Sequence, residues 1–500
     1  MTRNSGILLH PTSLPGRWGI GDLGAAAYTF VDFLAGSGQQ LWQVMPLGPT
    51  GYGDSPYQGF SAFAGNPLLI SLDRLLEEGL LDAGSLAGAP EFPDQHVDFG
   101  AVIPWKLNVL HQSFEHYKQH APQALRDEFA SFRTEQRTWL ADYALFAAIK
   151  GAHGGASWNS WEPALARHEA HAIDEQGSRL SHETEFHAYM QWQFFRQWCA
   201  LKEYANHRGI QIIGDIPIFV AFDSADVWGN REVFEIDEDG NPTVVAGVPP
   251  DYFSATGQLW GNPLYRWDAL EERGYRWWIE RFRTTLTLVD IARIDHFRGF
   301  AAYWAVPAGE PTAINGTWVR GPGTALFEAV RAALGSLPII AEDLGVITPD
   351  VEALRDELGF PGMKVLQFAF GGDPDDQYLP HNYPVRCVVY TGTHDNDTTT
   401  GWWYALAEHE RRNVQLYLGR DGSDISWDFI RIAFASVAET ALVPMQDVFG
   451  LGSEGRMNTP GRAAGNWGWR YTADMLTYEL AERLGTLTRI YGRARPAATE

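Results

Sequence analysis

The sequence predicts an α/β protein whose core is a closed (β/α)8 TIM barrel with helical and irregular insertions. Short apolar runs recur along the chain, and each ends in polar or glycine-rich residues, as expected of buried parallel strands. Helical patterns separate several of these runs, which is typical of a parallel sheet whose strands are joined by helices. The eight predicted strands lie in Gly6–His10, Gln40–Pro46, Ile210–Phe219, Leu288–Asp295, Leu337–Glu342, Met363–Phe370, Val385–Asp395 and Ala441–Phe449.

The run from 288 to 295 indicates which side chains of a barrel strand face the interior and which reach the site. Val289, Ile291, Arg293 and Asp295 share one parity, so on a strand they point to the same side. Two apolar residues followed by two charged ones fit a barrel strand that fills the interior below and reaches the functional rim above. The pattern therefore predicts a site at the carboxyl ends of the strands.

One catalytic barrel is expected to span residues 1–500, with three insertions between its strands. From about 75 to 205, apolar residues recur at three- and four-residue spacing, which predicts helices. The segment from about 222 to 275 is rich in Gly, Pro and aromatic residues and is expected to be irregular and lid-like. A third, helical insertion is expected from about 400 to 435.

Composition narrows the partner class and the compartment. The chain has 62 acidic and 38 basic residues, a net charge of −24, which disfavours nucleic acid and anionic membranes as partners. Cys199 and Cys387 are the only 2 cysteines, and the N-terminal segment lacks the apolar stretch of a signal peptide. No run approaches the roughly 18 apolar residues that cross a bilayer. We therefore expect a cytoplasmic protein without a membrane span, acting on a neutral or small substrate.

Four predicted strands carry an acid near their carboxyl ends: Asp215, Asp295, Glu342 and Asp395. A closed barrel brings these ends together, so the acids should share one pocket. Cleavage of a glycosidic bond needs two nearby carboxyl groups in opposite protonation states, one to protonate the leaving oxygen and one to attack or stabilise the sugar cation. Arg293 would keep Asp295 ionised, and Asp215 could anchor the arginine. A purely structural Arg293–Asp215 ion pair is an equally good interpretation.

The segments around these acids resemble, in order, the four signature regions of the α-amylase clan: Gly214-Asp-Ile-Pro217, Ala292-Arg-Ile-Asp-His-Phe-Arg298, Ile340-Ala-Glu-Asp-Leu-Gly345 and Thr393-His-Asp-Asn-Asp397. In detail they are most similar to the amylomaltases, the disproportionating 4-α-glucanotransferases. Further matching segments are Gly6-Ile-Leu-Leu-His-Pro-Thr-Ser-Leu-Pro15, Asp54-Ser-Pro-Tyr-Gln58, Pro249-Pro-Asp-Tyr-Phe-Ser254, Gln258-Leu-Trp-Gly-Asn-Pro263, Asn458-Thr-Pro-Gly461 and Gly465-Asn-Trp467. The resemblance covers nearly the whole chain.

This resemblance implies an activity and catalytic roles. Asp295 would be the nucleophile, Glu342 the general acid and base, and Asp395 a third carboxylate that binds sugar hydroxyls and stabilises the transition state. The enzyme would transfer α-1,4-glucan segments to the 4-hydroxyl of an acceptor through a glycosyl-aspartate. The implied substrates are maltooligosaccharides and amylose; no cofactor and no metal are expected, and a monomer is expected.

The resemblance also implies substrate contacts around the three acids. An aromatic ring would stack beneath the donor sugar, and polar side chains would bind its hydroxyls. The ring is that of Tyr57, and the expected contacts as a whole are Tyr57, Asp215, Asp251, Trp260, Arg293, His394 and Asn466.

Three alternatives remain open at this stage. Spacing does not separate transfer from hydrolysis by an α-1,4-glucan hydrolase, although the aromatic segment 245–262 has the composition of a lid that excludes water and so favours transfer. A metal-dependent barrel hydrolase could use His394 to Asp397, but the sequence offers no accompanying histidine cluster. A non-catalytic glucan-binding protein has no need of a proton donor at Glu342.

Overall fold

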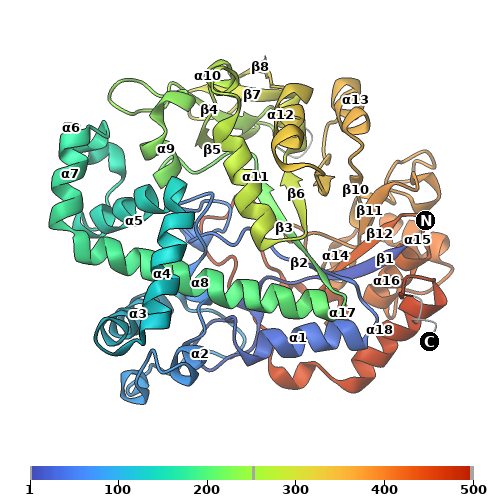
Figure 1. Ribbon diagram of the computed structural model, residues 1–500. Helices are drawn as coiled ribbons and strands as arrows, with labels where there is room; N and C mark the ends of the chain where they lie inside the picture. Colours follow the sequence, from blue (N-terminus) through green and yellow to red (C-terminus); the bar gives the residue numbers. More distant parts are fainter. Residues whose placement is uncertain (1–2, 251–253, 496–500) are drawn as a thin grey trace.

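The computed structural model describes residues 3–250 and 254–495 of the 500-residue chain. Within these residues, eight parallel strands form one sheet in the order β10-β11-β12-β1-β2-β3-β6-β9. Their bounds are β1 Asn4–Leu8, β2 Leu41–Gln43, β3 Gln211–Pro217, β6 Ile291–Asp295, β9 Ile339–Ala341, β10 Gly362–Val365, β11 Cys387–Tyr390 and β12 Thr440–Pro444. Each predicted run overlaps one strand, so the predicted (β/α)8 barrel is confirmed (Figure 1).

Closure of the barrel depends on the junction between β9 and β10. The amide of Ala341 at the end of β9 donates to the carbonyl of Pro361, just before β10, at 2.9 Å. Asp343 strengthens the junction, because its carboxylate accepts from the amide of Met363 at 2.7 Å and pairs with Arg355 at 2.5 Å. A Cβ at Gly362 would lie 2.3 Å from that carboxylate, so only glycine fits there.

Side chains of one parity fill the barrel interior. The interior cluster comprises Leu41, Ile213, Ile340, Met363, Val365, Val388, Tyr390 and Leu442. Ile291 packs against this cluster, and Nε of Arg293 lies 3.4 Å from Sδ of Met363, so the expected inward parity of the strand holds for these two residues. Val289 differs, because β6 begins at Ile291 and Val289 packs in the larger cluster outside the barrel.

The first insertion consists of helices, which lie at the left of Figure 1. They are α2 Leu72–Glu77, α3 Phe99–His120, α4 Gln123–Glu135, α5 Arg137–Ala152, α6 Pro163–Ala166, α7 Ala170–Arg179 and α8 Ser181–His207. Buried glutamines of α8 fix the loop that follows β2. The side-chain amide of Gln191 accepts from the Gly65 amide at 2.7 Å and donates to its carbonyl at 2.9 Å. Gln197 bonds the backbone of Ser71 in the same way.

The second insertion is more regular than expected. Two of its segments, β4 Val244–Val248 and β5 Gln258–Pro263, pair as an antiparallel hairpin. Strands β7 Ala302–Pro307 and β8 Thr317–Arg320, which follow β6, extend this hairpin to a four-stranded sheet of order β5-β4-β7-β8. The helices α9 Ala225–Gly229 and α10 Trp267–Glu272 flank the hairpin of β4 and β5. The hairpin was not expected from the sequence because a glycine interrupts each of its two short strands.

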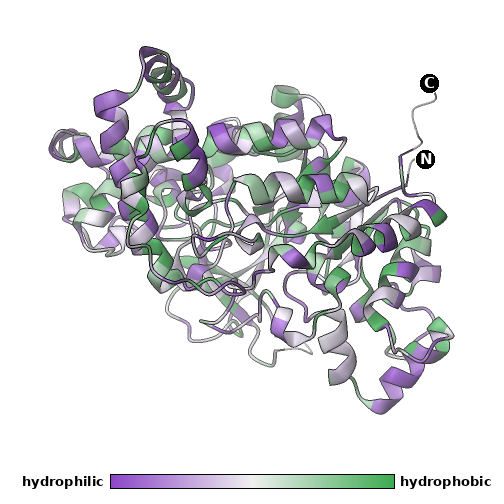
Figure 2. Ribbon diagram, turned by 90° about the horizontal axis from the view of Figure 1, so that it is seen from below, coloured by the Kyte–Doolittle hydropathy of each residue, from purple (hydrophilic) through white to green (hydrophobic). Residues whose placement is uncertain are grey.

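The remaining helices surround the barrel. They are α1 Ala25–Gly36, α11 Arg276–Leu288, α12 Thr324–Leu334, α13 Pro349–Leu358, α14 Thr399–Ala405, α15 Glu408–Leu418, α16 Ile425–Ala435, α17 Met445–Phe449 and α18 Tyr478–Ile490. Hydrophilic and hydrophobic residues alternate along the outer helices in Figure 2, as expected where one face meets the barrel and the other meets water. Among the described helices, none has the length and apolar character needed to traverse a bilayer.

Candidate active site

The four acids of the predicted site come from the carboxyl ends of barrel strands. Asp215 lies within β3 and Asp295 ends β6, while Glu342 directly follows β9. Asp395 lies five residues beyond β11, in the loop before α14. Because β3, β6 and β9 are neighbours in the sheet, the first three acids project from one side of the barrel mouth.

Asp215, Arg293 and Asp295 form a continuous charged chain. Asp215 and Arg293 are register partners on adjacent strands, and their carboxylate and guanidinium groups are 2.6 Å apart. The second guanidinium nitrogen lies 3.0 Å from Asp295. The Asp215 side chain is 0% exposed and that of Arg293 4%, whereas that of Asp295 is 33% exposed. The arginine therefore bridges a buried acid to an acid that is open to a ligand.

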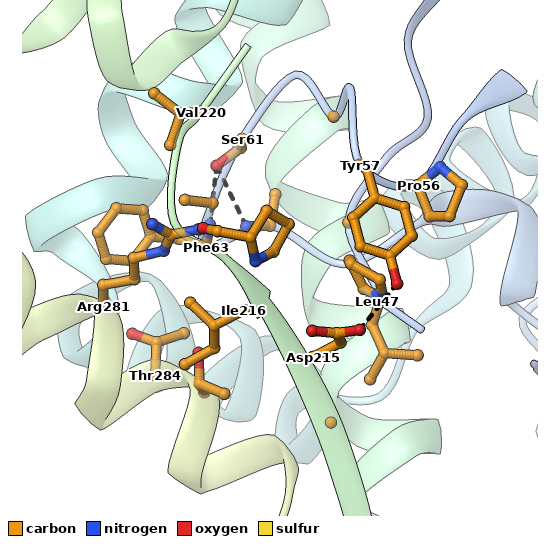
Figure 3. A pocket seen from close by; sticks show the side chains of 18 of the residues that line it. Leu47, Pro56, Tyr57, Ser61, Phe63, Asp215, Ile216, Val220, Arg281 and Thr284 are labelled. Carbon is orange, nitrogen blue, oxygen red and sulfur yellow. Dashed lines mark hydrogen bonds between the residues drawn. The ribbon is translucent and has the colours of Figure 1, made fainter. Parts of the chain in front are cut away.

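The charge of Arg293 is secured by its neighbours. Burial alone would lower the pKa of its guanidinium, but Asp215 and Asp295 raise that pKa well above its usual value. Tyr57 adds a neutral donor, because its hydroxyl donates to Asp215 at 2.7 Å. Figure 3 shows this contact at one end of a cavity of about 80 Å³ that continues toward Ser61 and Arg281.

Glu342 is attached to the residue that follows Asp295. Its Oε2 accepts from the backbone amide of His296 at 2.6 Å, and its Oε1 accepts from the amide of Leu344 at 2.8 Å. His296 has a left-handed backbone, φ 53°, at the end of β6. Burial and the charge of Asp295 raise the pKa of Glu342 to about 8, although Arg293 and the two amides act in the opposite direction. Glu342 is thus protonated at neutral pH beside Asp295.

Asp395 is held in a different way, by side chains from loops. Asn458 donates to one carboxylate oxygen at 2.6 Å, and Nε2 of His394 lies 3.4 Å from the other. The His394 ring stacks on the Tyr57 ring, with centroids 5.0 Å apart and planes inclined by 17°. Trp467 packs near both rings, at 5.8 and 6.0 Å. Through these rings the Asp395 side of the mouth meets the Tyr57–Asp215 side.

Trp260 places the β4–β5 hairpin beside the predicted nucleophile. Its ring meets the His296 ring edge-on, with centroids 4.7 Å apart. Burial, followed by the charge of Arg298, lowers the pKa of His296 to about 3, so this ring is neutral. Asp251, the other predicted contact in this hairpin, lies outside the described residues.

The side-chain amide of Asn466 is hydrogen-bonded to the backbone of its own loop. The side chain accepts from the Thr459 amide at 3.0 Å and donates to the Arg462 carbonyl at 2.9 Å, so it closes the 459–466 loop. A sugar contact by Asn466 stays a prediction. Sequence reasoning assigned no role to Asn458 and Trp467, although both lie in matching segments; only the fold shows that they reach Asp395 and Tyr57.

His10 and Asp397 are two further polar residues near the barrel mouth that could be considered as metal ligands. His10, two residues beyond β1, is buried; burial and the nearby His394 lower its pKa to about 3. Asp397 bonds Ser453 at 2.7 Å and the Thr398 amide at 2.8 Å, and so organises the loop. Within the described ranges, the one set of three metal-type ligands that lie together is found in the helical insertion and not among the barrel acids.

Comparison with known proteins identifies the family. A family model described as 4-alpha-glucanotransferase matches residues 9–477. The chain belongs to this family. It is 55% identical to a 4-alpha-glucanotransferase of Synechocystis sp., with 98% of each chain covered, and 53% identical to one of Thermus thermophilus, with 100% and 99% covered. Like them, it is an enzyme that transfers glucan segments.

Solved structures of this 4-alpha-glucanotransferase family agree with the fold. The amylomaltase from Streptococcus agalactiae in complex with acarbose superposes with a TM-score of 0.96 at 40% identity, covering 99% of this chain and 100% of that one. The amylomaltase from Corynebacterium glutamicum superposes with a TM-score of 0.81 at 21% identity, covering 99% and 75%. At 21% identity, the similarity to the Corynebacterium glutamicum structure supports the fold alone.

Proposed function

We propose that this chain disproportionates α-1,4-glucans by double displacement, with Asp295 as nucleophile and Glu342 as general acid and base. The observation that carries the proposal is the contrast between these two carboxyl groups. Asp295 is paired with a charged Arg293, whereas burial and the nearby Asp295 keep Glu342 protonated, and the His296 amide joins the two. This is the pair of protonation states that a retaining glycosyl transfer requires.

In the first displacement, the glucan bond to C1 of the donor sugar breaks. A carboxylate oxygen of Asp295 attacks C1 as the Glu342 proton passes to the departing O4 of the leaving glucan. The products are a glycosyl ester on Asp295, a free glucan or glucose, and ionised Glu342. Both Glu342 oxygens accept a backbone amide, but each has a second lone pair, so the proton and the amides can coexist.

In the second displacement, the acceptor reverses these steps. The 4-hydroxyl of a second glucan gives its proton to Glu342 while its oxygen attacks C1, and the ester bond to Asp295 breaks. Glu342 returns to the protonated state and Asp295 to the ionised state. No cofactor enters either step. Water in place of the acceptor would give hydrolysis, so the ratio of the two reactions depends on what reaches C1.

The surrounding residues bind and orient the donor sugar. Asp395 and His394 offer an acceptor and a ring nitrogen at the barrel mouth, the arrangement needed to bind two sugar hydroxyls. Tyr57, stacked on His394 and fixed by Asp215, offers a ring face for the apolar face of a sugar. We assign Trp260, on the β4–β5 hairpin, to the cover that limits water. Asp251 and Asn466 are further contacts predicted by the resemblance.

The finer statements about partners and compartment are also proposals. The glucans proposed as substrates are maltooligosaccharides and amylose, since the proposed acids act on glycosidic bonds and the chain's net charge of −24 suits a neutral ligand. Composition supports a cytoplasmic enzyme without nucleic-acid or membrane partners, and a monomer remains an expectation.

Incubation of the purified enzyme with maltotriose alone tests the transfer reaction. Transfer produces glucose and a ladder of longer oligomers while the total number of reducing ends stays constant. A steady rise in reducing ends with no longer oligomers would contradict the proposal and favour the hydrolase. Binding of maltotriose without any product would contradict it in favour of a glucan-binding protein.

A further inference from the structure

Four side chains of the helical insertion form a cluster that the glucan chemistry does not use. His111 and Glu115 lie one turn apart on α3, and His182 and Glu183 lie in the first turn of α8. Residues four apart on a helix share a face, so the first pair points toward one neighbour. That neighbour is the beginning of α8, and both helices lie at the left of Figure 1. The cluster thus joins the two longest helices described in this insertion.

The distances in this cluster suit a tetrahedral cation. Oε1 of Glu183 lies 3.2 Å from Nδ1 of His182 and 3.8 Å from Nε2 of His111. One ligand atom from each of the three residues lies within 4.8 Å of the others. A zinc ion with bonds of about 2.0–2.2 Å needs its ligand atoms roughly 3.3–3.6 Å apart. Small side-chain movements would therefore bring all three atoms to bonding positions.

Glu115 supplies the partner that metal-binding histidines usually have. Its carboxylate lies 2.6 Å from Nε2 of His182, the ring nitrogen away from Glu183. A metal ligand commonly donates its second ring N–H to a carboxylate, which fixes the tautomer and leaves the other nitrogen free to bind. In that tautomer the lone pair of Nδ1 faces the Glu183 carboxylate. A metal ion placed between these two groups would bind both the ring nitrogen and the carboxylate.

Both imidazoles are held in place by buried phenyl rings. The His111 ring meets Phe186 edge-on at 4.9 Å, and the His182 ring meets Phe114 edge-on at 5.3 Å. Phe114 is fully buried and Phe186 nearly so. Ligands fixed by packing lose less rotational freedom on binding an ion. The four polar side chains are 38–46% exposed, so an ion can enter from solvent.

We propose that His111, His182 and Glu183 form a binding site for a borderline divalent cation, of the class of Zn²⁺, with water as the fourth ligand. Two imidazoles and one carboxylate are the donors that zinc accepts, and a softer thiolate is not required. Glu115 is a positioning residue that acts through His182. The bound ion connects the first long helix of the insertion to its last, and it has no part in glucan transfer.

Zinc titration of the full-length protein tests this site. The protein is prepared without a polyhistidine tag, stripped with a chelator and titrated with ZnCl2 by calorimetry, and its Tm is measured with and without the ion. One zinc per chain and a higher Tm in zinc are expected, because an ion bound to the folded state stabilises it. No binding at 100 µM total zinc would overturn the proposal.

Two double variants separate this site from chance binding. His111→Gln with His182→Gln removes two ligands and should abolish both the stoichiometric zinc and the Tm increase. His116→Gln with His120→Gln is the matched control, since these rings also lie close together on α3, at 4.5 Å, but outside the cluster. Unchanged binding in the first variant, or lost binding in the second, would contradict the assignment.

Single variants and a rate measurement separate zinc binding from misfolding and from glucan transfer. Should the first double variant fold poorly, Glu183→Gln alone should also abolish the zinc-dependent Tm increase. Glu115→Gln should weaken zinc binding about 10- to 100-fold without abolishing it. The maltotriose rate should be the same in zinc and in chelator for every variant; a zinc-dependent rate would show that the ion acts elsewhere.

Discussion

The two sides of the barrel mouth are built differently. On one side Asp215, Arg293 and Glu342 come from adjacent strands: the first two are buried and paired with each other, and Glu342 accepts from backbone amides just beyond the strands. On the other side Asp395 lies in a loop, its side chain is 47% exposed, and it is held by Asn458 from a segment 63 residues away. The strand side therefore sets protonation states, and the loop side presents the groups that we propose bind the substrate.

This difference separates stability from activity. Removing Asp215 or Arg293 from the strand side leaves a buried charge without its partner, which costs both folding and rate. Removing a member of the loop side leaves no buried charge without its partner, so only substrate binding and the transfer rate should decrease. The comparison can be tested with substitutions of decreasing effect.

The largest effect is expected at Asp295. Asp295→Asn removes the proposed nucleophile, so the maltotriose transfer rate should fall by about 10⁴-fold or more. The side chain is 33% exposed and asparagine has the same shape, so the Tm should stay close to that of the wild type. A rate within tenfold of the wild type would show that another group attacks C1.

Glu342→Gln should have the next largest effect. The amide cannot protonate the leaving oxygen, so transfer from maltotriose should fall by about 10²–10⁴-fold. A donor with a good leaving group, such as an α-glycosyl fluoride, needs no proton, and its first displacement should be largely retained. Equal loss with both donors would contradict the acid role.

The raised pKa of Glu342 predicts a pH dependence. In the proposed mechanism the free enzyme is active with Glu342 protonated, so kcat/KM for maltotriose should fall about tenfold per pH unit above pH 8. The same shift affects folding: a carboxyl whose folded pKa lies above its unfolded value contributes stability at low pH that is lost as the pH rises toward 8. The Tm of the wild type should therefore fall relative to that of Glu342→Gln between pH 5 and pH 8.

Much of the strand side could be predicted from sequence for a physical reason. The period of two along 288–295 places Ile291 in the interior and Arg293 above it, and the closed barrel brings Asp215 to the next strand at the same level. Local pattern and global fold agree at these residues. The protonation of Glu342 could not be predicted in detail, because it depends on burial and on the His296 amide.

The loop side needed the structure because its contacts are not periodic. Nothing in the spacing of Asn458 and Asp395 indicates that their side chains bond at 2.6 Å. The small sheet of β4, β5, β7 and β8 was missed for a related reason: its strands are short, and pairing of β4 with β7 joins residues about 60 apart. Such pairings are decided by tertiary packing and not by local propensity.

Arg293 and Asp395 allow a direct test of the difference between the two sides. Arg293→Gln leaves Asp215 buried without its cation. The free energy of unfolding should fall by about 3–5 kcal/mol, which lowers the Tm, and the transfer rate should fall as well. Asp395→Asn should reduce kcat/KM by about 10²-fold with little change in Tm, because the group is partly solvated. Equal changes in Tm would break the distinction.

The smallest effect is expected in the loop that holds Asp395. Asn458→Ala removes a donor 2.6 Å from the Asp395 carboxylate, so kcat/KM should fall about tenfold, the cost of one hydrogen bond to a charged group. Asn466→Ala is the matched control: it loosens the same loop but has no contact with Asp395. If Asn458 acts by orienting Asp395, combining Asn458→Ala with Asp395→Asn should cost no more than Asp395→Asn alone, whereas additive losses would show that Asn458 acts on the substrate separately. A loss at Asn466 equal to that at Asn458 would mean that loop order or the predicted sugar contact of Asn466, and not the single hydrogen bond to Asp395, limits the loop side.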